Sequence, residues 1–143
     1  MKKIFGLFFI ILFSISACKK SSSPNISTVT IKYEINLTSA LKDTSTNALI
    51  KYTSADGTLQ TATDFLPGNT SWTKTISISS TVRPFPIELK TTGISNNYIY
   101  LTAPGTVTTK ITVDNSIRVY QNSTTVNGPG YYFDSFALKD TLR

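Results

Sequence analysis

Apolar and polar residues alternate from Thr28 to Leu37, and this alternation constrains the fold more than any other feature of the sequence. Its apolar members are Val29, Ile31, Tyr33, Ile35 and Leu37. A β-strand turns successive side chains to opposite faces of its sheet. The segment therefore predicts a strand with one buried face and one solvated face.

Similar short runs recur along the rest of the chain, and no stretch keeps the apolar period of a helix. Gly, Pro, Asn and Asp separate the runs, as turns between strands require. We therefore expect an all-β protein, an immunoglobulin-like β-sandwich of seven to nine short antiparallel strands. A small β-barrel is the alternative.

Two turn signals set the register of neighbouring strands. Asp56-Gly57 favours a type I′ turn, and a two-residue loop at this position pairs Tyr52 with Thr61. In contrast, the segment 114–116 predicts a three-residue loop. That length sets Val113 opposite Ile117 on one apolar face, and it places Asn115 or Ser116 in the left-handed conformation.

The last run, Tyr131 to Leu138, changes phase in its middle. Tyr131 and Phe133 fall at odd-numbered positions, whereas Phe136 and Leu138 fall at even-numbered positions, which face the other side of a strand. A β-bulge near Asp134-Ser135 explains this change, and a single strand with both faces covered explains it equally well.

The first residues have the layout of a secretory signal peptide. Lys2 and Lys3 precede an apolar run from Ile4 to Ile15, and Ser16-Ala17 then precede Cys18, the one cysteine of the chain. The run is shorter than the roughly 20 residues that a membrane-spanning helix needs.

Ile15-Ser16-Ala17-Cys18 resembles the lipobox of bacterial lipoproteins. The resemblance implies cleavage before Cys18 and lipidation of its sulfur and its new amino group. We therefore expect the membrane to be a partner through the lipid on Cys18, since two or more acyl chains give stable anchoring. The alternative is a free or buried thiol in a retained membrane anchor.

Three segments follow from this interpretation. They are a cleaved leader at 1–17, a lipidated cysteine with a flexible tether at 18–27, and a β-sandwich domain at 28–143. The tether is rich in serine, as flexible linkers are.

The formal charge of +6 resides mostly outside the domain. Without Lys2, Lys3, Lys19 and Lys20 the charge is +2. The remaining basic residues are scattered along the sequence with no cluster or stripe, so we expect no nucleic-acid partner.

Several segments together resemble a known family. They are Tyr33-Glu34-Ile35, the run 49–57, Leu66-Pro67 with Trp72 nearby, Leu101-Thr102-Ala103 and Ile111-Thr112-Val113-Asp114. Their order resembles the MmpS family of small mycobacterial membrane proteins and similar short bacteroidete lipoproteins. The resemblance covers about Tyr33 to Val119. It implies a small β-sandwich held outside a membrane by an N-terminal anchor, with a proton-driven export pump as partner.

Two features depart from that family. Residues 68–71 separate Leu66-Pro67 from Trp72, whereas the family tends to have leucine, proline and tryptophan contiguous. The expected anchor is a lipid and not a helix.

The chain has no histidine, which excludes Ser-His-Asp and Cys-His catalysis and His-based metal sites. Of the carboxylates, Asp56 and Asp114 belong to turns, and Glu34 and Glu88 fall on polar strand faces. A glycosidase would need two carboxylates facing each other across a cleft. We therefore expect no catalytic residues, no metal and no cofactor, and we do not expect an enzyme.

Tyr98, Tyr100 and Tyr120 are the candidate contacts for a ligand or partner. They alternate with the apolar residues of their strands, so we expect them on the solvent-facing side. Exposed aromatic rings can stack on sugars or anchor a partner protein. The alternative is that cross-strand neighbours cover their rings. Trp72 is expected in the core.

Asp140-Thr141-Leu142 resembles a short bacteroidete O-glycosylation motif, and a frayed C-terminus explains it equally well.

These observations predict a non-enzymatic envelope lipoprotein that serves as an adaptor or structural partner, with a glycan- or ligand-binding module as the alternative. Lys19 follows Cys18 at the position where enteric inner-membrane lipoproteins carry an aspartate. This favours the outer membrane. No acidic export tract follows Cys18, so we expect the domain to face the periplasm.

Overall fold

The computed structural model describes residues 27–42, 49–92, 98–124 and 130–143. Within them the chain forms ten strands: β1 (Thr28–Leu37), β2 (Leu49–Thr53), β3 (Leu59–Ala62), β4 (Ser71–Ser79), β5 (Phe85–Thr92), β6 (Tyr98–Leu101), β7 (Thr106–Val113), β8 (Ser116–Thr124), β9 (Tyr131–Asp134) and β10 (Ala137–Leu142). The all-β prediction is confirmed, although the strands number ten and not seven to nine. The described residues include no helix long and apolar enough to cross a membrane.

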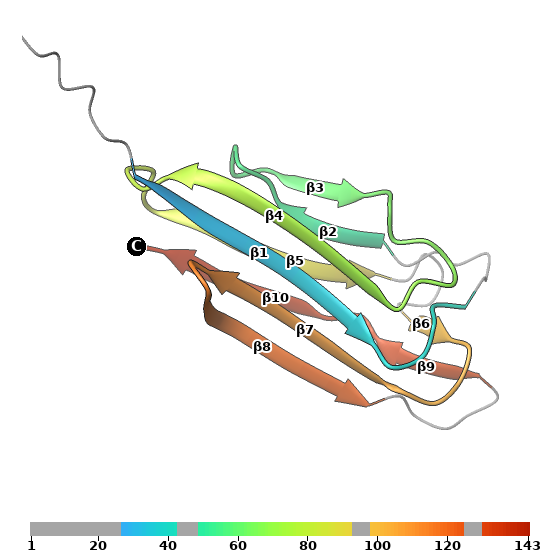
Figure 1. The fold of residues 1–143 in the computed structure, drawn as a ribbon. Helices are drawn as coiled ribbons and strands as arrows, with labels where there is room; N and C mark the ends of the chain where they lie inside the picture. Colours follow the sequence, from blue (N-terminus) through green and yellow to red (C-terminus); the bar gives the residue numbers. More distant parts are fainter. Residues whose placement is uncertain (1–26, 43–48, 93–97, 125–129) are drawn as a thin grey trace, which may run out of the picture.

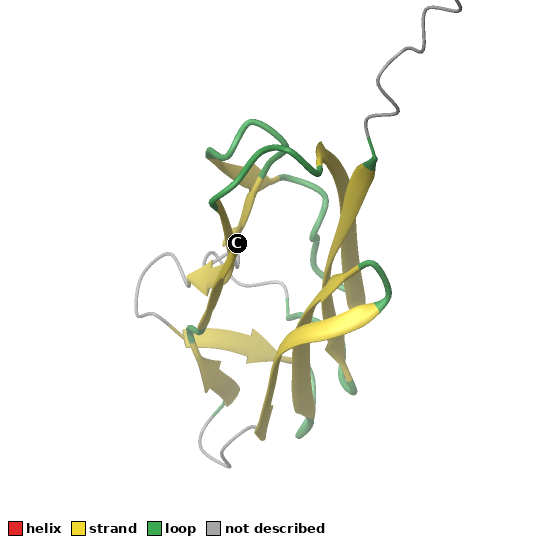
Figure 2. Cartoon of the chain, turned by 90° about the vertical axis from the view of Figure 1, so that its left-hand side faces the viewer, coloured by secondary structure: helices red, strands yellow, loops and turns green. Residues whose placement is uncertain are grey.

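The strands build two four-stranded sheets and one small pair. The first sheet has the order β4-β1-β7-β8, the second has the order β10-β5-β2-β3, and β6 pairs with β9. All of these pairings are antiparallel. Figure 1 and the end-on view in Figure 2 show the two larger sheets facing each other as a β-sandwich.

β1 supplies the centre of the core, as its alternation predicts. Its five alternate apolar side chains are all buried: Val29, Ile31, Tyr33, Ile35 and Leu37. β1 is paired on both sides, with β4 and with β7. Each large apolar side chain moved from water into such a core contributes about 1.5–3 kcal/mol.

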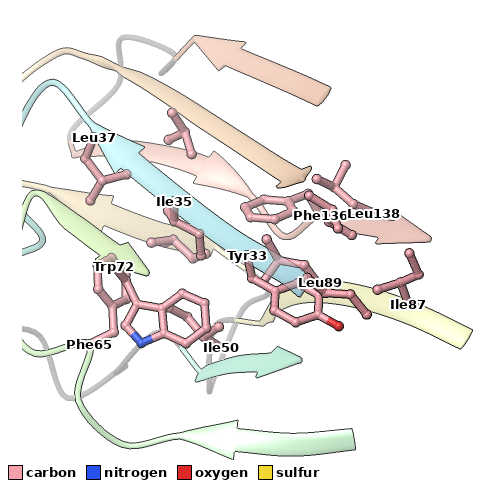
Figure 3. Packing of buried hydrophobic residues seen from close by; sticks show 14 of the residues in the cluster. Tyr33, Ile35, Leu37, Ile50, Phe65, Trp72, Ile87, Leu89, Phe136 and Leu138 are labelled. Carbon is pink, nitrogen blue, oxygen red and sulfur yellow. The ribbon is translucent and has the colours of Figure 1, made fainter. Parts of the chain in front are cut away.

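Tyr33 joins the two sheets by a hydrogen bond as well as by packing. Its ring is fully buried, and its hydroxyl donates to the backbone carbonyl of Thr53 on β2, with 2.9 Å between the oxygens. The Thr53 hydroxyl in turn accepts from the Glu88 N–H of β5 at 2.9 Å. Burial disfavours the phenolate and raises the pKa of Tyr33 above its ordinary value. Figure 3 shows Tyr33 in the same cluster as Ile50 and Leu89.

The loop at Asp56-Gly57 is one residue longer than its sequence predicts. Tyr52 pairs with Gln60 and not with Thr61. Gly57 alone in this loop has a positive φ, of 83°, whereas a type I′ turn would need two such residues. The Asp56 carboxylate accepts hydrogen bonds from Ser54 and Thr58 and so closes the turn from within.

The loop at Asp114-Asn115 is one residue shorter than predicted. Val113 pairs with Ser116, and both Asp114 and Asn115 have positive φ, of 46° and 66°. The left-handed conformation expected at Asn115 or Ser116 occurs at Asn115, and Asp114 also has a positive φ. The expected pairing of Val113 with Ile117 is wrong, because Ile117 is 60% exposed and needs no place on the buried face.

A register shift after Ile111 restores the expected pairing further along these strands. Thr112 pairs with Ile117 and Ile111 with Val119, so Arg118 is the extra residue on β8. Such a bulge bends its strand and re-aims the side chain that it carries.

The run Tyr131 to Leu138 is two strands, so both sequence interpretations of it are wrong. β9 pairs with β6, whereas β10 pairs with β5 in a different sheet. The change of parity marks a change of sheet, and Phe133 and Phe136 are buried on either side of it. β10 continues to Leu142, which is buried, so the segment 140–142 is not frayed.

The start of β1 and the end of β10 lie at one end of the sandwich, which we call the N-terminal end (Figure 1). The Asp114 turn is fixed there, because its carboxylate accepts the Thr30 N–H at 2.8 Å. β6 and β9 lie at the opposite end, which we call the far end (Figure 1).

Replacing Tyr33 by Phe is expected to lower the free energy of unfolding by about 1–3 kcal/mol, because the buried Thr53 carbonyl loses its donor. Urea denaturation measures this change. Tyr120→Phe is the matched control and should change stability by less than about 0.5 kcal/mol, since Tyr120 is 57% exposed. Equal effects of the two substitutions would contradict the role of the hydrogen bond between the sheets.

Candidate functional site

Three tyrosines form a cluster at the far end. Tyr98 and Tyr100 belong to β6, and Tyr132 of β9 is the cross-strand partner of Tyr100. The Tyr132 ring centroid lies 4.6 Å from that of Tyr98 and 6.0 Å from that of Tyr100. These tilted contacts are typical of stabilising aromatic pairs. Ile99 and Leu101 occupy the other face of β6 and are buried.

The structure separates the three tyrosines that the sequence singles out. Tyr98 and Tyr100 are half-buried, as the alternative of covered rings predicts, because Tyr132 lies against both. Tyr120 is 57% exposed and pairs with Lys110 in the first sheet. Among the ring contacts of the described residues, none joins Tyr120 to the cluster. Sequence reasoning missed Tyr132, although its parity is opposite to that of the buried Phe133.

A hollow with basic walls lies at the N-terminal end. It is an open hollow of about 590 Å³ lined by Arg118, Lys139, Asp140, Thr141 and Arg143. Arg118 comes from the bulge in β8, and the others come from β10 and the residue after it. The Arg118 Nε donates to Asp140 Oδ2 at 3.1 Å and thereby links the edges of the two sheets. Basic residues that are scattered in sequence therefore do gather in space here.

A smaller hollow of about 170 Å³ lies on the flank between β3 and β4. Trp72 Nε1 donates to Asp64 Oδ1 at 2.7 Å, and the Tyr52 and Trp72 ring centroids are 5.7 Å apart. Lys74 Nζ lies 5.6 Å from the Tyr52 ring centroid, in cation–π range. Trp72 is 5% exposed, so its predicted place in the core is confirmed. These groups serve one another and cap the core on this flank.

Glu34 and Glu88 each lie between two lysines on the outer face of a sheet. Glu34 is within 2.9 Å of Lys32 Nζ and 3.1 Å of Lys110 Nζ. Glu88 Oε1 is 3.5 Å from Lys90 Nζ and from Lys139 Nζ. Because the two glutamates are on opposite sheets and both point outward, they do not face each other across a cleft.

Neighbouring groups lower the pKa values of two carboxylates, those of Glu34 and Asp56. Burial of Glu34 would by itself raise its pKa, but the ammonium groups of Lys32 and Lys110 outweigh burial and hold the pKa below its ordinary value. Hydrogen bonds from Ser54 and Thr58 lower the pKa of Asp56 to about 2. The lowered pKa of Glu34 is thus the effect of its ion pairs, and that of Asp56 is the effect of the hydrogen bonds in its turn.

No protein-family model matches this chain, and a comparison with curated proteins finds no similar protein.

Two further points concern the predicted sites. Cys18 lies outside the described residues. Within the ranges that the structure describes, no three Cys, His, Asp or Glu side chains are grouped so as to hold a metal ion.

Replacing Glu34 by Gln is expected to lower stability at pH 7 by about 1 kcal/mol, as for a partly screened ion-pair network. Because the folded pKa of Glu34 is depressed, its contribution is present above the unfolded pKa and is lost as the pH falls through the folded pKa. The wild type should therefore lose more stability than E34Q between pH 7 and pH 3, as measured by thermal unfolding.

Asn36→Ala is the control for this experiment, since Asn36 is an exposed, non-titrating residue on the same face of β1. It should keep the wild-type pH dependence. A pH dependence of E34Q that matches the wild type would contradict the assignment.

Proposed function

We propose that this chain is a lipid-anchored lipoprotein of the bacterial envelope, and that its β-sandwich is a non-enzymatic adaptor or structural domain. The observation that carries the proposal is Ile15-Ser16-Ala17-Cys18 after a short apolar run, followed closely by a strand. The lipid on Cys18 holds the domain at the membrane, at the outer membrane on its periplasmic side.

The place where the chain enters the fold supports this arrangement. Residues 19–27 separate the lipidated Cys18 from β1. A flexible segment of that length spans roughly 17 Å on average, and at most about 35 Å when fully extended. The N-terminal end of the sandwich therefore stays near the bilayer. The far end, with β6 and β9, lies at the opposite end of the sandwich from the tether, where a partner can meet it.

The adaptor role rests on the chemistry of the chain and on the family resemblance. The absence of histidine removes the common nucleophilic triads, and the resemblance to MmpS proteins suggests a transport complex as the partner. The partner is an envelope protein that contacts the far end of the domain, away from the lipid anchor.

A second candidate function is favoured by the tyrosine cluster. The rings of Tyr98, Tyr100 and Tyr132 are neighbours on the paired strands β6 and β9. Neighbouring aromatic rings with hydroxyl groups suit a sugar, which has both apolar faces and hydrogen-bonding edges. The domain would then be a binding module for glycans.

Cys18→Ala is expected to prevent both lipidation and cleavage before residue 18, so its product should keep the leader and carry no acyl group. Mass spectrometry of the wild type should show a chain that begins at Cys18 and carries acyl groups. Ser16→Ala, which keeps a small residue before the cysteine, should leave processing unchanged. An intact leader or an unmodified thiol would contradict the anchor.

The adaptor role is tested by crosslinking in intact membranes. A tagged wild-type protein should yield one defined envelope protein that is lost when the far-end residues Tyr98 and Tyr132 are replaced by Ala. Recovery of the lipoprotein alone would contradict an adaptor role.

The glycan alternative predicts a different pattern on a glycan array. Tyr98→Ala and Tyr132→Ala should each weaken binding by about tenfold or more, as loss of a central aromatic contact does. Tyr120→Ala is the matched control and should bind like the wild type, because Tyr120 lies outside the cluster. An array without binding, or equal losses in all three variants, would exclude this candidate.

A further inference from the structure

The hollow at the N-terminal end collects positive charge. Arg118, Lys139 and Arg143 contribute three cations, and Asp140 is the one carboxylate side chain that lines it. The hollow is open to water at these groups, since the Lys139 side chain is 68% exposed and that of Arg118 is 46% exposed. The lining side chains therefore carry a formal excess of two positive charges, which the Glu88 carboxylate 3.5 Å from Lys139 Nζ reduces.

Asp140 holds the Arg118 side chain in place at the edge of the hollow. One of its oxygens accepts from Arg118 Nε at 3.1 Å, and the other accepts from the Thr141 N–H at 2.8 Å. Both oxygens are thus engaged. A guanidinium carries five N–H donors, and the bond to Asp140 uses one of them.

This set of groups matches a phosphate. A guanidinium offers planar, paired donors to phosphate oxygens, and a lysine adds a strongly hydrated point charge. Thr141 is a further residue of the lining, and its hydroxyl is a neutral group that can donate. The Lys139 ammonium is only loosely paired, because it lies 3.5 Å from Glu88 Oε1.

The hollow lies at the end of the sandwich where the chain leaves toward Cys18. Figure 1 places the start of β1 and the C-terminal residue at the same end of the sandwich, and Figure 2, in which this end faces the viewer, shows them on different sheets. Two other carboxylates of this end, Asp56 and Asp114, are engaged by hydrogen bonds in or beside their own turns.

We propose that this hollow binds the phosphate of an anionic phospholipid headgroup in the membrane that holds the lipid anchor. The inference rests on the proposed function, because a tether of about ten residues brings this end within reach of the bilayer. Electrostatic attraction extends only about 8 Å at physiological salt. The contact therefore forms when the domain docks end-on, and it fixes the orientation that keeps the far end away from the membrane.

Hydrogen–deuterium exchange of the lipidated full-length product tests this proposal. The protein is reconstituted in vesicles of phosphatidylcholine alone and of phosphatidylcholine with one quarter phosphatidylglycerol. Exchange in the segments 116–118 and 139–143 should slow about fivefold or more in the anionic vesicles, and high salt should reverse the effect. Exchange in the far-end segment 131–134 should not change.

Matched variants separate docking from general charge. Lys139→Gln with Arg143→Gln should abolish the slowing. The double variant Lys42→Gln with Lys51→Gln removes the same charge outside the hollow and should still show the slowed exchange. Slowing that survives the first pair, or is lost with the second pair, would overturn the proposal.

Two further outcomes are distinguishable. Failure to float with phosphatidylcholine vesicles would contradict the lipid anchor itself, whereas flotation with identical exchange in both vesicles would overturn the headgroup site alone. Inorganic phosphate added to the phosphatidylcholine vesicles tests a soluble ligand. Equal slowing by that ion would assign the hollow to free phosphate and overturn the headgroup assignment.

Discussion

The contact of Tyr33 with the second sheet is the interaction on which the rest of the structure depends. A tyrosine on the buried face of β1 needs an acceptor for its hydroxyl, since an unpaired buried hydroxyl is costly. The Thr53 carbonyl supplies that acceptor, and Thr53 also receives the N–H of Glu88. One side chain thus ties β1 to β2 and, through Thr53, to β5, while its ring fills the space between the sheets.

This constraint also places the surfaces of the molecule. With β1 fixed across the core, its first residue lies at one end of the sandwich and its last residue at the other (Figure 1). The basic hollow therefore shares an end with the start of the chain's folded part, and the tyrosine cluster occupies the opposite end. Glu34 and Glu88 lie on the outward faces of β1 and β5, and each carboxylate is neutralised by two lysines.

The sequence was sufficient to predict elements whose physics is local. The alternation in β1 predicts its buried face, and the apolar runs predict the all-β class. The two loops were harder, because each depends on where an aspartate finds its donors. Asp56 bonds within its own turn, whereas Asp114 bonds to Thr30 on a different strand. No local pattern distinguishes these two cases.

The candidate site shows the same limit. The positions of Tyr98 and Tyr100 on one face of a strand could be predicted from parity. Their contact with Tyr132 could not, because it requires β9 to pair with β6, a long-range pairing that no local pattern reports. The gathering of Arg118 with Lys139 and Arg143 likewise depends on a bulge and on two sheet edges that meet only in the folded protein.

Native-state hydrogen exchange tests the central claim most directly, because it reports stability strand by strand. If Tyr33 and β1 hold the two sheets together, the amides of Tyr33 and Ile35 should exchange only through global unfolding. Their opening free energy should then equal the free energy of unfolding measured with denaturant, while the amides of the edge strand β3 open more readily. Exchange of the β1 amides through a smaller, local opening that leaves the other strands protected would contradict the account.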